Sequence, residues 1–181
     1  MPFVSEDWAA GRSWDEYLGS VEKHADLWKH HWEHAEVDAG TRARLTDLPG
    51  VRRVLILTED WCGDAVRSVP VIVRACHEAE GVEVRLLDIA GHADLMNRHL
   101  SKRAKAIPVA IVMDGEGNDL GWWGPRPAPL QAILRDRLRE LGSPPKDEIG
   151  KFYAPIMGWY KKDGGKTTLA EFALLLERTV G

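Results

Sequence analysis

The feature that most limits the fold of this chain is a cysteine at the junction of a strand-like and a helix-like segment. Val54-Leu55-Ile56-Leu57 is an apolar run typical of a buried strand, and residues 63–80 carry apolar side chains at helical spacing. The stretch between them, Thr58 to Ala65, contains Cys62. The pattern therefore places a thiol at a helix N-terminus, where unpaired backbone N–H groups and the helix dipole favour a thiolate.

Cys62 has no partner for a disulfide within the chain. A dithiol redox motif needs a second cysteine three residues later, and that position is Ala65. The other cysteine, Cys76, lies on the same predicted helix, roughly 21 Å away at about 1.5 Å per residue, whereas a disulfide needs Cα atoms within about 7 Å. Cys76 lies among Val69, Ile72 and Val73, so we expect it to be a buried, apolar-like side chain.

Length and composition indicate one ordinary globular domain. The chain has 181 residues, of which 44% are hydrophobic and 29% are charged. A net charge of −4 argues against general nucleic-acid binding. The N-terminus lacks a basic region followed by an apolar stretch, and no apolar run is long enough to span a membrane. We therefore expect a cytoplasmic protein without a signal peptide.

The remaining elements follow from apolar spacing and from capping and turn residues. We predict helices over residues 13–36, 63–80, 92–103, 127–141, 147–162 and 168–180, and strands over residues 52–58, 82–88, 108–113 and 120–123. Capping boxes at Ser13–Glu16 and Thr168–Glu171 open the first and last helices, and residues 1–12 are expected to be irregular. A strand, a helix and a strand in succession predict a parallel pair. The fold class is therefore α/β, with a mixed central sheet in a three-layer α/β/α arrangement.

This order of elements and residues resembles the thioredoxin superfamily. Trp61-Cys62-Gly63 matches the start of the family's Trp-Cys-Gly-Pro-Cys motif, and Pro70 stands where the family's helix has its kink proline. Ile107-Pro108 opens the next-to-last strand, where the family carries a cis-proline. The match covers about residues 50–141 of a single domain spanning 1–181, with helical extensions at about 13–37 and 146–180. The chain resembles bacterial thioredoxin-like proteins that have a Trp-Cys-Gly-Asp motif and extra terminal helices.

The resemblance implies which residues form the site. Cys62 would be the nucleophile and would face Pro108, while Ile107 would offer backbone groups to an extended peptide. Trp61, Gly63 and Asp64 would shape the substrate-binding loop. A trans proline at a strand start is the alternative for Pro108.

Three positions depart from the family pattern. Ala65 replaces the resolving cysteine, and Asp64 replaces the motif proline. Ile56 replaces a buried aspartate that helps proton transfer to and from the resolving thiol, so its loss fits Ala65.

Nearby charges oppose the helix effect on Cys62. The carboxylates of Glu59, Asp60 and Asp64 raise a thiol pKa, and Arg67 is placed to neutralise Asp64 at i, i+3. These contributions are of similar size, so the sequence leaves open both the ionisation of Cys62 and whether it is reactive or an inert remnant.

The sequence supports one leading function and two alternatives. The leading hypothesis is a monothiol redox protein that forms mixed disulfides through Cys62 with a protein or a low-molecular-weight thiol. The first alternative is a non-catalytic binding or adaptor protein that uses the same groove. The second gives the apolar tail around Phe172 a role in assembly with another copy, although packing on its own domain is the default; the oligomeric state stays open.

Other suggestive patterns predict ordinary structure. His30 and His34 have i, i+4 spacing that can hold a metal, but they lack the His-Glu-x-x-His pattern and lie beside tryptophans, which favours a packing or solvated face. Gly164–Thr168 resembles the end of a phosphate loop, but Tyr160 occupies the position of the required first glycine. Arg126 is expected to be solvated at a helix start. We therefore expect no metal and no cofactor.

Overall fold

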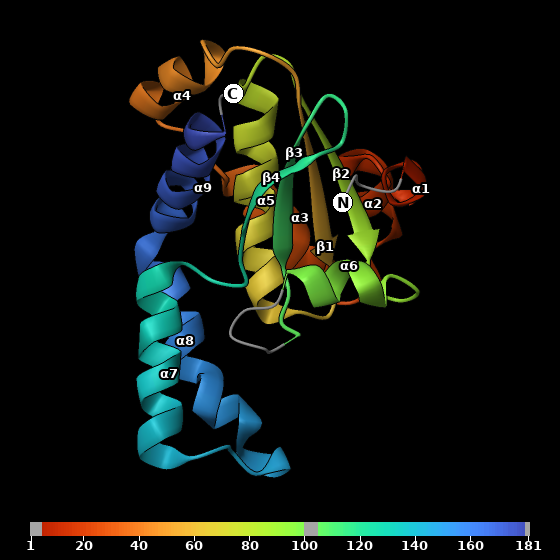
Figure 1. Cartoon of the computed structure of the whole chain (residues 1–181). Helices are drawn as coiled ribbons and strands as arrows, with labels where there is room; N and C mark the ends of the chain where they lie inside the picture. The colour runs from red at the N-terminus through yellow and green to blue at the C-terminus, as the bar shows by residue number, and fades with distance from the viewer. Residues whose placement is uncertain (1–4, 100–104, 180–181) are drawn as a thin grey trace.

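The chain folds as an α/β protein with helices on both faces of a mixed sheet, as a computed structural model of residues 5–99 and 105–179 describes it (Figure 1). The helices are α1 Ser5–Ala10, α2 Trp14–Ser20, α3 Ala25–His34, α4 Ala39–Thr46, α5 Gly63–Glu78, α6 Ala93–Arg98, α7 Ala128–Leu141, a 3-10 turn Lys146–Glu148, α8 Ile149–Asp163 and α9 Lys166–Arg178. The strands are β1 Arg52–Thr58, β2 Val82–Asp88, β3 Val109–Asp114 and β4 Asp119–Trp123. The predicted helix over 92–103 reaches into residues 100–104, and the last predicted helix ends at residue 180; these ends lie outside the described residues.

The sheet has the strand order β2-β1-β3-β4. β1 pairs in parallel with β2 and antiparallel with β3, and β3 forms a hairpin with β4. The predicted parallel pair and the hairpin are therefore confirmed. β1 is central, and six of its seven residues are buried, because its apolar run faces helices on both sides.

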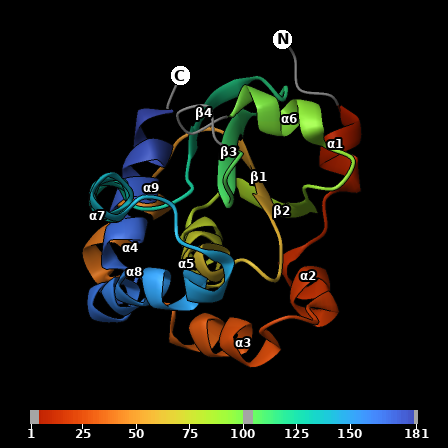
Figure 2. The same ribbon diagram turned by 90° about the horizontal axis from the view of Figure 1, so that it is seen from below.

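α5 is the helix that covers one face of the sheet, and α6 lies on the opposite face (Figure 2). α3 and α9 flank α5 and bury their apolar sides against it. Phe172 and Leu176 of α9 are fully buried in this core. The apolar C-terminal helix thus packs on its own domain, which was the expected arrangement.

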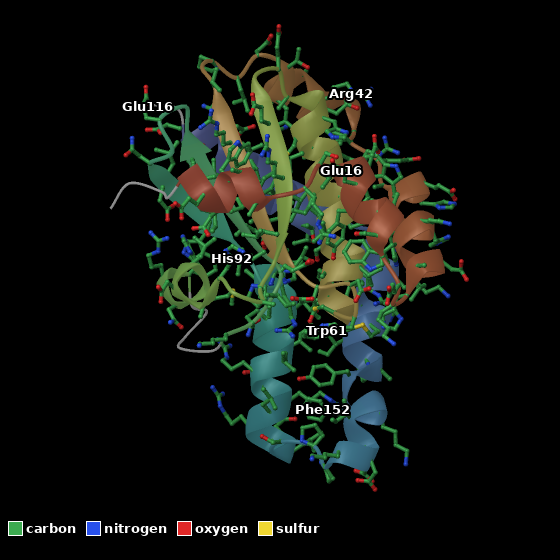
Figure 3. The ribbon with its side chains drawn as sticks, turned by 90° about the vertical axis from the view of Figure 1, so that its right-hand side faces the viewer. Glu16, Arg42, Trp61, His92, Glu116 and Phe152 are labelled. Atoms are coloured by element: carbon green, nitrogen blue, oxygen red, sulfur yellow. The ribbon has the colours of Figure 1, made fainter. Side chains whose placement is uncertain are left out.

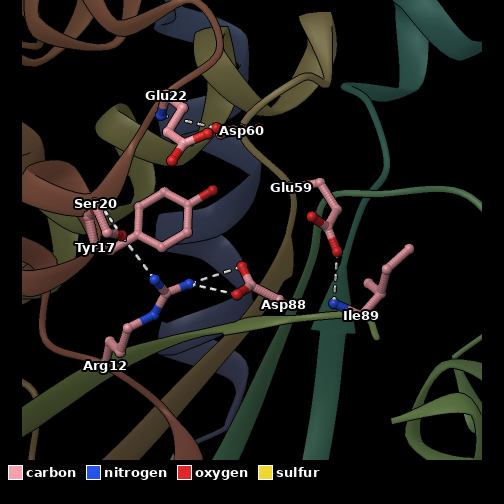
Figure 4. Close-up of polar contacts among 8 residues, drawn as sticks. All are labelled: Arg12, Tyr17, Ser20, Glu22, Glu59, Asp60, Asp88 and Ile89. Carbon is pink, nitrogen blue, oxygen red and sulfur yellow. Dashed lines mark hydrogen bonds and ion pairs between the residues drawn. The ribbon is translucent and has the colours of Figure 1, made fainter. Parts of the chain in front are cut away.

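The N-terminal region differs from the prediction of one long helix. The capping box at Ser13 and Glu16 forms, but the helix ends at Ser20 and a new one begins at Ala25, after His24 in a left-handed conformation (φ 57°). α1 and α4 fill segments in which no helix was predicted. The long-helix prediction was wrong because a distant residue stabilises the break. The Asp60 carboxylate accepts the backbone N–H of Glu22 at 2.9 Å (Figure 4) and that of Lys23 at 2.8 Å.

α7 and α8 lie side by side and extend beyond the end of the sheet as a two-helix arm (Figure 1). The arm has its own small core: Leu130, Leu134, Phe152, Ile156 and Tyr160. Its base is tied to the main body by contacts with α5 and α9.

The second predicted capping box was wrong. α9 begins at Lys166, two residues early, and Thr168 is buried inside its first turn. Glu171 instead accepts the indole N–H of Trp123 (2.8 Å) and the backbone N–H of Ala128 at the start of α7 (2.8 Å). The carboxylate that looked like a local cap therefore joins α9 to β4 and α7.

Within the described residues, no helix combines the length and apolar character needed to cross a bilayer. The same residues contain no group of three or more His, Cys, Asp or Glu side chains arranged to hold a metal ion.

Candidate functional site

Cys62 lies where β1 gives way to α5 and serves as the N-cap of that helix. Its Sγ accepts the backbone N–H of Ala65 at 3.4 Å and donates to the carbonyl oxygen of Ile107 at 3.5 Å. The Ile107–Pro108 peptide bond is cis, as the resemblance implied. Cys62 and the segment before β3 therefore meet, although 45 residues separate Cys62 from Ile107.

The environment of Cys62 raises the pKa of its thiol. Burial is the main cause, since the residue is only 8% exposed, and the Asp64 carboxylate acts in the same direction. The N–H of Ala65 stabilises the thiolate and opposes these two effects without overcoming them. At neutral pH the thiol is therefore mostly protonated, with its S–H directed at the carbonyl oxygen of Ile107.

The acidic residues before the cysteine have structural partners. Glu59 accepts the backbone N–H of Ile89 at 3.0 Å, just after β2 (Figure 4). Asp60 caps the break between α2 and α3, and its carbonyl oxygen accepts the indole N–H of Trp28 at 3.0 Å. The two residues thus fix the loop that leads to Cys62 to β2 and to the N-terminal helices.

Asp64 is the hub of a buried polar network. Its carboxylate forms an ion pair with Arg126 at 2.6 Å and accepts the hydroxyl of Tyr160 at 2.8 Å. Burial and the neighbouring carboxylate both raise the pKa of the Tyr160 hydroxyl, so it stays a donor. The network connects the cysteine loop with the start of α7 and the end of α8.

Two sequence expectations about these charges were wrong. Arg67 does not pair with Asp64; its guanidinium donates to the carbonyl oxygen of Gly63 at 2.8 Å. Arg126 is not solvated, because its side chain is only 12% exposed and is paired with Asp64. The loop before α7 turns Arg126 inward, and its guanidinium neutralises the Asp64 carboxylate in the first turn of α5.

Trp61 and Gly63 lie on either side of the cysteine in different surroundings. Trp61 is 55% exposed and lies close to where the arm joins the body (Figure 3). Gly63 lies beneath Met157 of α8, whose sulfur is 3.4 Å from the position that a Cβ at Gly63 would occupy. The exposed ring of Trp61 thus lies on one side of Cys62, and Met157 of the arm covers Gly63 on the other side.

The segment after β4 closes on Pro108. Gly124 has φ +138°, and a Cβ there would lie 2.1 Å from the carbonyl oxygen of Pro108. Only glycine permits this approach of two backbones. The Gly124–Pro125 bond is also cis, and the chain then leads directly to Arg126.

Sequence reasoning found one side of the site and missed the other. The structure brings Cys62 to Ile107 and Pro108, and Trp61, Gly63 and Asp64 are the chain neighbours of the cysteine. The roles of these residues in a reaction stay predictions. Arg126 and Tyr160 were missed. The one available signal for Arg126 was a charged residue inside a short proline-bounded loop, and Tyr160, 96 residues after Asp64, had none.

The histidine pair and the glycine-rich stretch have ordinary structural roles. The His30 and His34 rings lie 4.3 Å apart on α3, and a His34 ring nitrogen bonds to the backbone carbonyl of His30. Gly164 and Gly165 form the left-handed connection between α8 and α9 rather than a phosphate loop.

Comparison with known proteins agrees with this architecture. The family model described as Thioredoxin matches residues 11–139. A crystal structure of a protein of unknown function from Pseudomonas aeruginosa is similar with a TM-score of 0.71 at 19% identity, covering 98% of both chains. An HIV epitope-scaffold structure has a TM-score of 0.71 at 19% identity, covering 97% of this chain and 98% of its own. No curated protein matches the sequence. The family match covers most of the chain and includes Cys62 and Pro108, so the protein belongs to the thioredoxin family.

Proposed function

We propose that the protein is a monothiol redox protein that forms mixed disulfides through Cys62 with a protein or a low-molecular-weight thiol. The observation that carries the proposal is the position of Sγ, between the first N–H groups of α5 and the carbonyl oxygen that precedes Pro108. Although burial raises the pKa of this thiol, the backbone N–H of Ala65 at the helix start stabilises the thiolate once the proton has left. Cys76, in contrast, is fully buried inside α5, and its burial raises the pKa of its thiol strongly.

The exchange proceeds in two balanced steps. The Cys62 thiol gives its proton to solvent, and the thiolate attacks one sulfur of a disulfide RS–SR. A bond forms between Cys62 and one R–S group, the original S–S bond breaks, and the second RS⁻ leaves and takes up a proton. Cys62 is oxidised, and the released thiol is reduced. Because Ala65 occupies the resolving position, an external thiolate then attacks the mixed disulfide and returns Cys62 to its reduced form.

The surroundings of Cys62 favour an extended protein segment or a small peptide disulfide as partner. The Trp61 ring is more than half exposed at the site, which gives an incoming chain an apolar surface. The backbone around Ile107 lies beside the sulfur and would pair with an extended substrate. A reducing compartment would keep both cysteines as free thiols, so we place the protein in the cytoplasm as part of this proposal.

The test is adduct formation on the native protein. Native protein is incubated with oxidised glutathione at pH 8, and adducts are mapped by intact mass and peptide mass spectrometry. We expect one glutathionyl group on Cys62 in the wild type and in Cys76→Ser, none in Cys62→Ser, and removal by a second thiol. No adduct on native protein, with adducts on both cysteines in urea, would contradict the proposal.

One observation favours a second candidate, a non-catalytic binding protein. Cys62 is 8% exposed, and Asp64 beside it is held by both Arg126 and Tyr160. A thiol enclosed in this way is expected of a protein whose surface holds a partner without turnover at the cysteine. The adduct experiment separates the two candidates, because a binding protein needs no reactivity at Cys62.

A further inference from the structure

A concave site away from Cys62 lies between α3, α5 and the arm helix α8. The cleft has a volume of about 520 Å³, within the range of small-molecule sites. Apolar side chains line its interior: Leu27 from α3, Val71 from α5 and Met157 from α8. It is separate from the contact of Cys62 with Ile107, although Met157 and Arg67 also lie against Gly63.

The polar groups that line this cleft are basic or neutral. Arg67 projects from α5 and Lys161 from α8, and α3 contributes His30, His31 and His34. Among the described residues, no Asp or Glu side chain lines the cleft. Arg67 and Lys161 form no ion pair with any described residue. In a chain with a net charge of −4, this is a local concentration of positive charge.

The pKa of His31 reflects the burial and positive charge in this cleft. Burial, followed by the positive charge of Arg67 and the neighbouring His30 and His34, lowers the pKa of His31 to about 4. His31 is therefore neutral near pH 7, and Arg67 and Lys161 are the cations that line the cleft. Like charges that share a cleft without an acid repel each other, which is unfavourable, and a bound anion relieves this repulsion.

We propose that this cleft binds a small organic anion, with its carboxylate, sulfonate or phosphate group between Arg67 and Lys161 and its apolar part against Val71 and Met157. The volume suits a small molecule, and charge complementarity identifies the anionic group. The site does not depend on thiol chemistry at Cys62, so it stands or falls separately from the proposed function.

A pair of fluorescent probes tests this directly. The probe is 8-anilinonaphthalene-1-sulfonate, which joins an apolar body to one sulfonate, and its neutral counterpart is N-phenyl-1-naphthylamine. Both are titrated into folded wild-type protein and into R67Q/K161Q. We expect the double variant to weaken sulfonate binding about tenfold or more and to leave binding of the neutral probe within about twofold.

The matched control is K29Q/K151Q. It removes the same net charge from exposed positions on α3 and α8 outside the cleft. We expect its sulfonate affinity to equal that of the wild type. The single variant K161Q, at an exposed residue, guards against loss of folding and should retain part of the effect. Equal sulfonate binding by all variants, or equal weakening of both probes, would overturn the proposal.

Discussion

Gly124 and Pro108 meet through their backbones near Cys62, and this contact requires that residue 124 has no Cβ. A Cβ at Gly124 would lie 2.1 Å from the carbonyl oxygen of Pro108, and the φ of +138° is one that L side chains rarely adopt. Pro108 follows Ile107, whose carbonyl oxygen accepts a hydrogen bond from the Cys62 thiol. Cys62 therefore contacts Ile107, and the next residue, Pro108, contacts Gly124.

Gly124→Ala should be among the most damaging small substitutions in the chain. We expect a loss of more than about 3 kcal/mol in the free energy of unfolding, because a backbone segment has to move. Urea denaturation followed by circular dichroism measures it. The control is Gly158→Ala in α8, where a Cβ meets nothing within 4 Å and a gain of about 0.5–1 kcal/mol is expected. Similar stabilities for the two variants would refute the close-approach argument.

Asp64→Asn should make Cys62 more reactive. The change removes the carboxylate that raises the Cys62 pKa and leaves the positive charge of Arg126 in place. We expect iodoacetamide to alkylate Cys62 about three- to tenfold faster at pH 7, measured in a Cys76→Val background. Glu83→Gln, at an exposed carboxylate on β2, makes the same charge change and should have no effect. A slower reaction in Asp64→Asn would show that Asp64 acts on Cys62 in another way.

Cys76 predicts how stability depends on alkaline pH. Burial raises its pKa in the folded protein, so the folded state keeps the proton while the unfolded chain loses it above about pH 8.5. This contribution to stability is complete below that pH and is lost as pH rises toward the folded pKa. Between pH 8.0 and 9.5 we expect Cys76→Val to lose about 1 kcal/mol less unfolding free energy than the wild type. Parallel pH profiles in urea denaturation would contradict the assignment.

The base of the arm is joined to the start of α5 by two polar contacts to Asp64. Tyr160, near the end of α8, reaches Asp64 in the first turn of α5, and Arg126 before α7 holds the other carboxylate oxygen. The remaining arm residues pack among themselves in a separate cluster around Phe152. The orientation of the arm relative to the site is therefore set mainly at its base.

Tyr160→Phe should loosen this connection while keeping the ring in place. Loss of a buried hydrogen bond to a carboxylate is expected to cost about 1.5–3 kcal/mol. Tyr153→Phe on the same helix removes a hydroxyl that has no hydrogen bond in the described part of the chain, and it should change stability by less than about 0.5 kcal/mol. Urea denaturation compares the two variants; equal effects would mean that the Asp64 contact contributes little.

Across the whole molecule, the sequence was most informative where structure is local. The apolar run of β1, the helical spacing of α5 and the Asp114–Asn118 turn predicted the sheet and its hairpin because neighbouring residues determine them. The break between α2 and α3 was missed because its hydrogen bonds come from Asp60, 37 or 38 residues away. Glu171 likewise looked like a local cap but bonds across 43 and 48 residues.

The candidate site shows the same division. The cysteine and its neighbours could be read from a short motif, and Ile107-Pro108 from its place before a strand. The charges around the sulfur depend on Arg126 and Tyr160, which only the folded chain brings to Asp64. The sequence could therefore predict that Cys62 lies at the start of a helix, but not the burial and the Asp64 network that act on its pKa.

The most direct test is the rate of mixed-disulfide formation by Cys76→Val with oxidised glutathione, measured at urea concentrations from zero to the unfolding midpoint. If Cys62 reacts from its place beside Ile107 and Pro108, the rate is measurable without urea and stays nearly constant until the protein begins to unfold. If the rate is instead proportional to the unfolded fraction throughout, Cys62 reacts only after global unfolding. That result would contradict a redox function for the native protein.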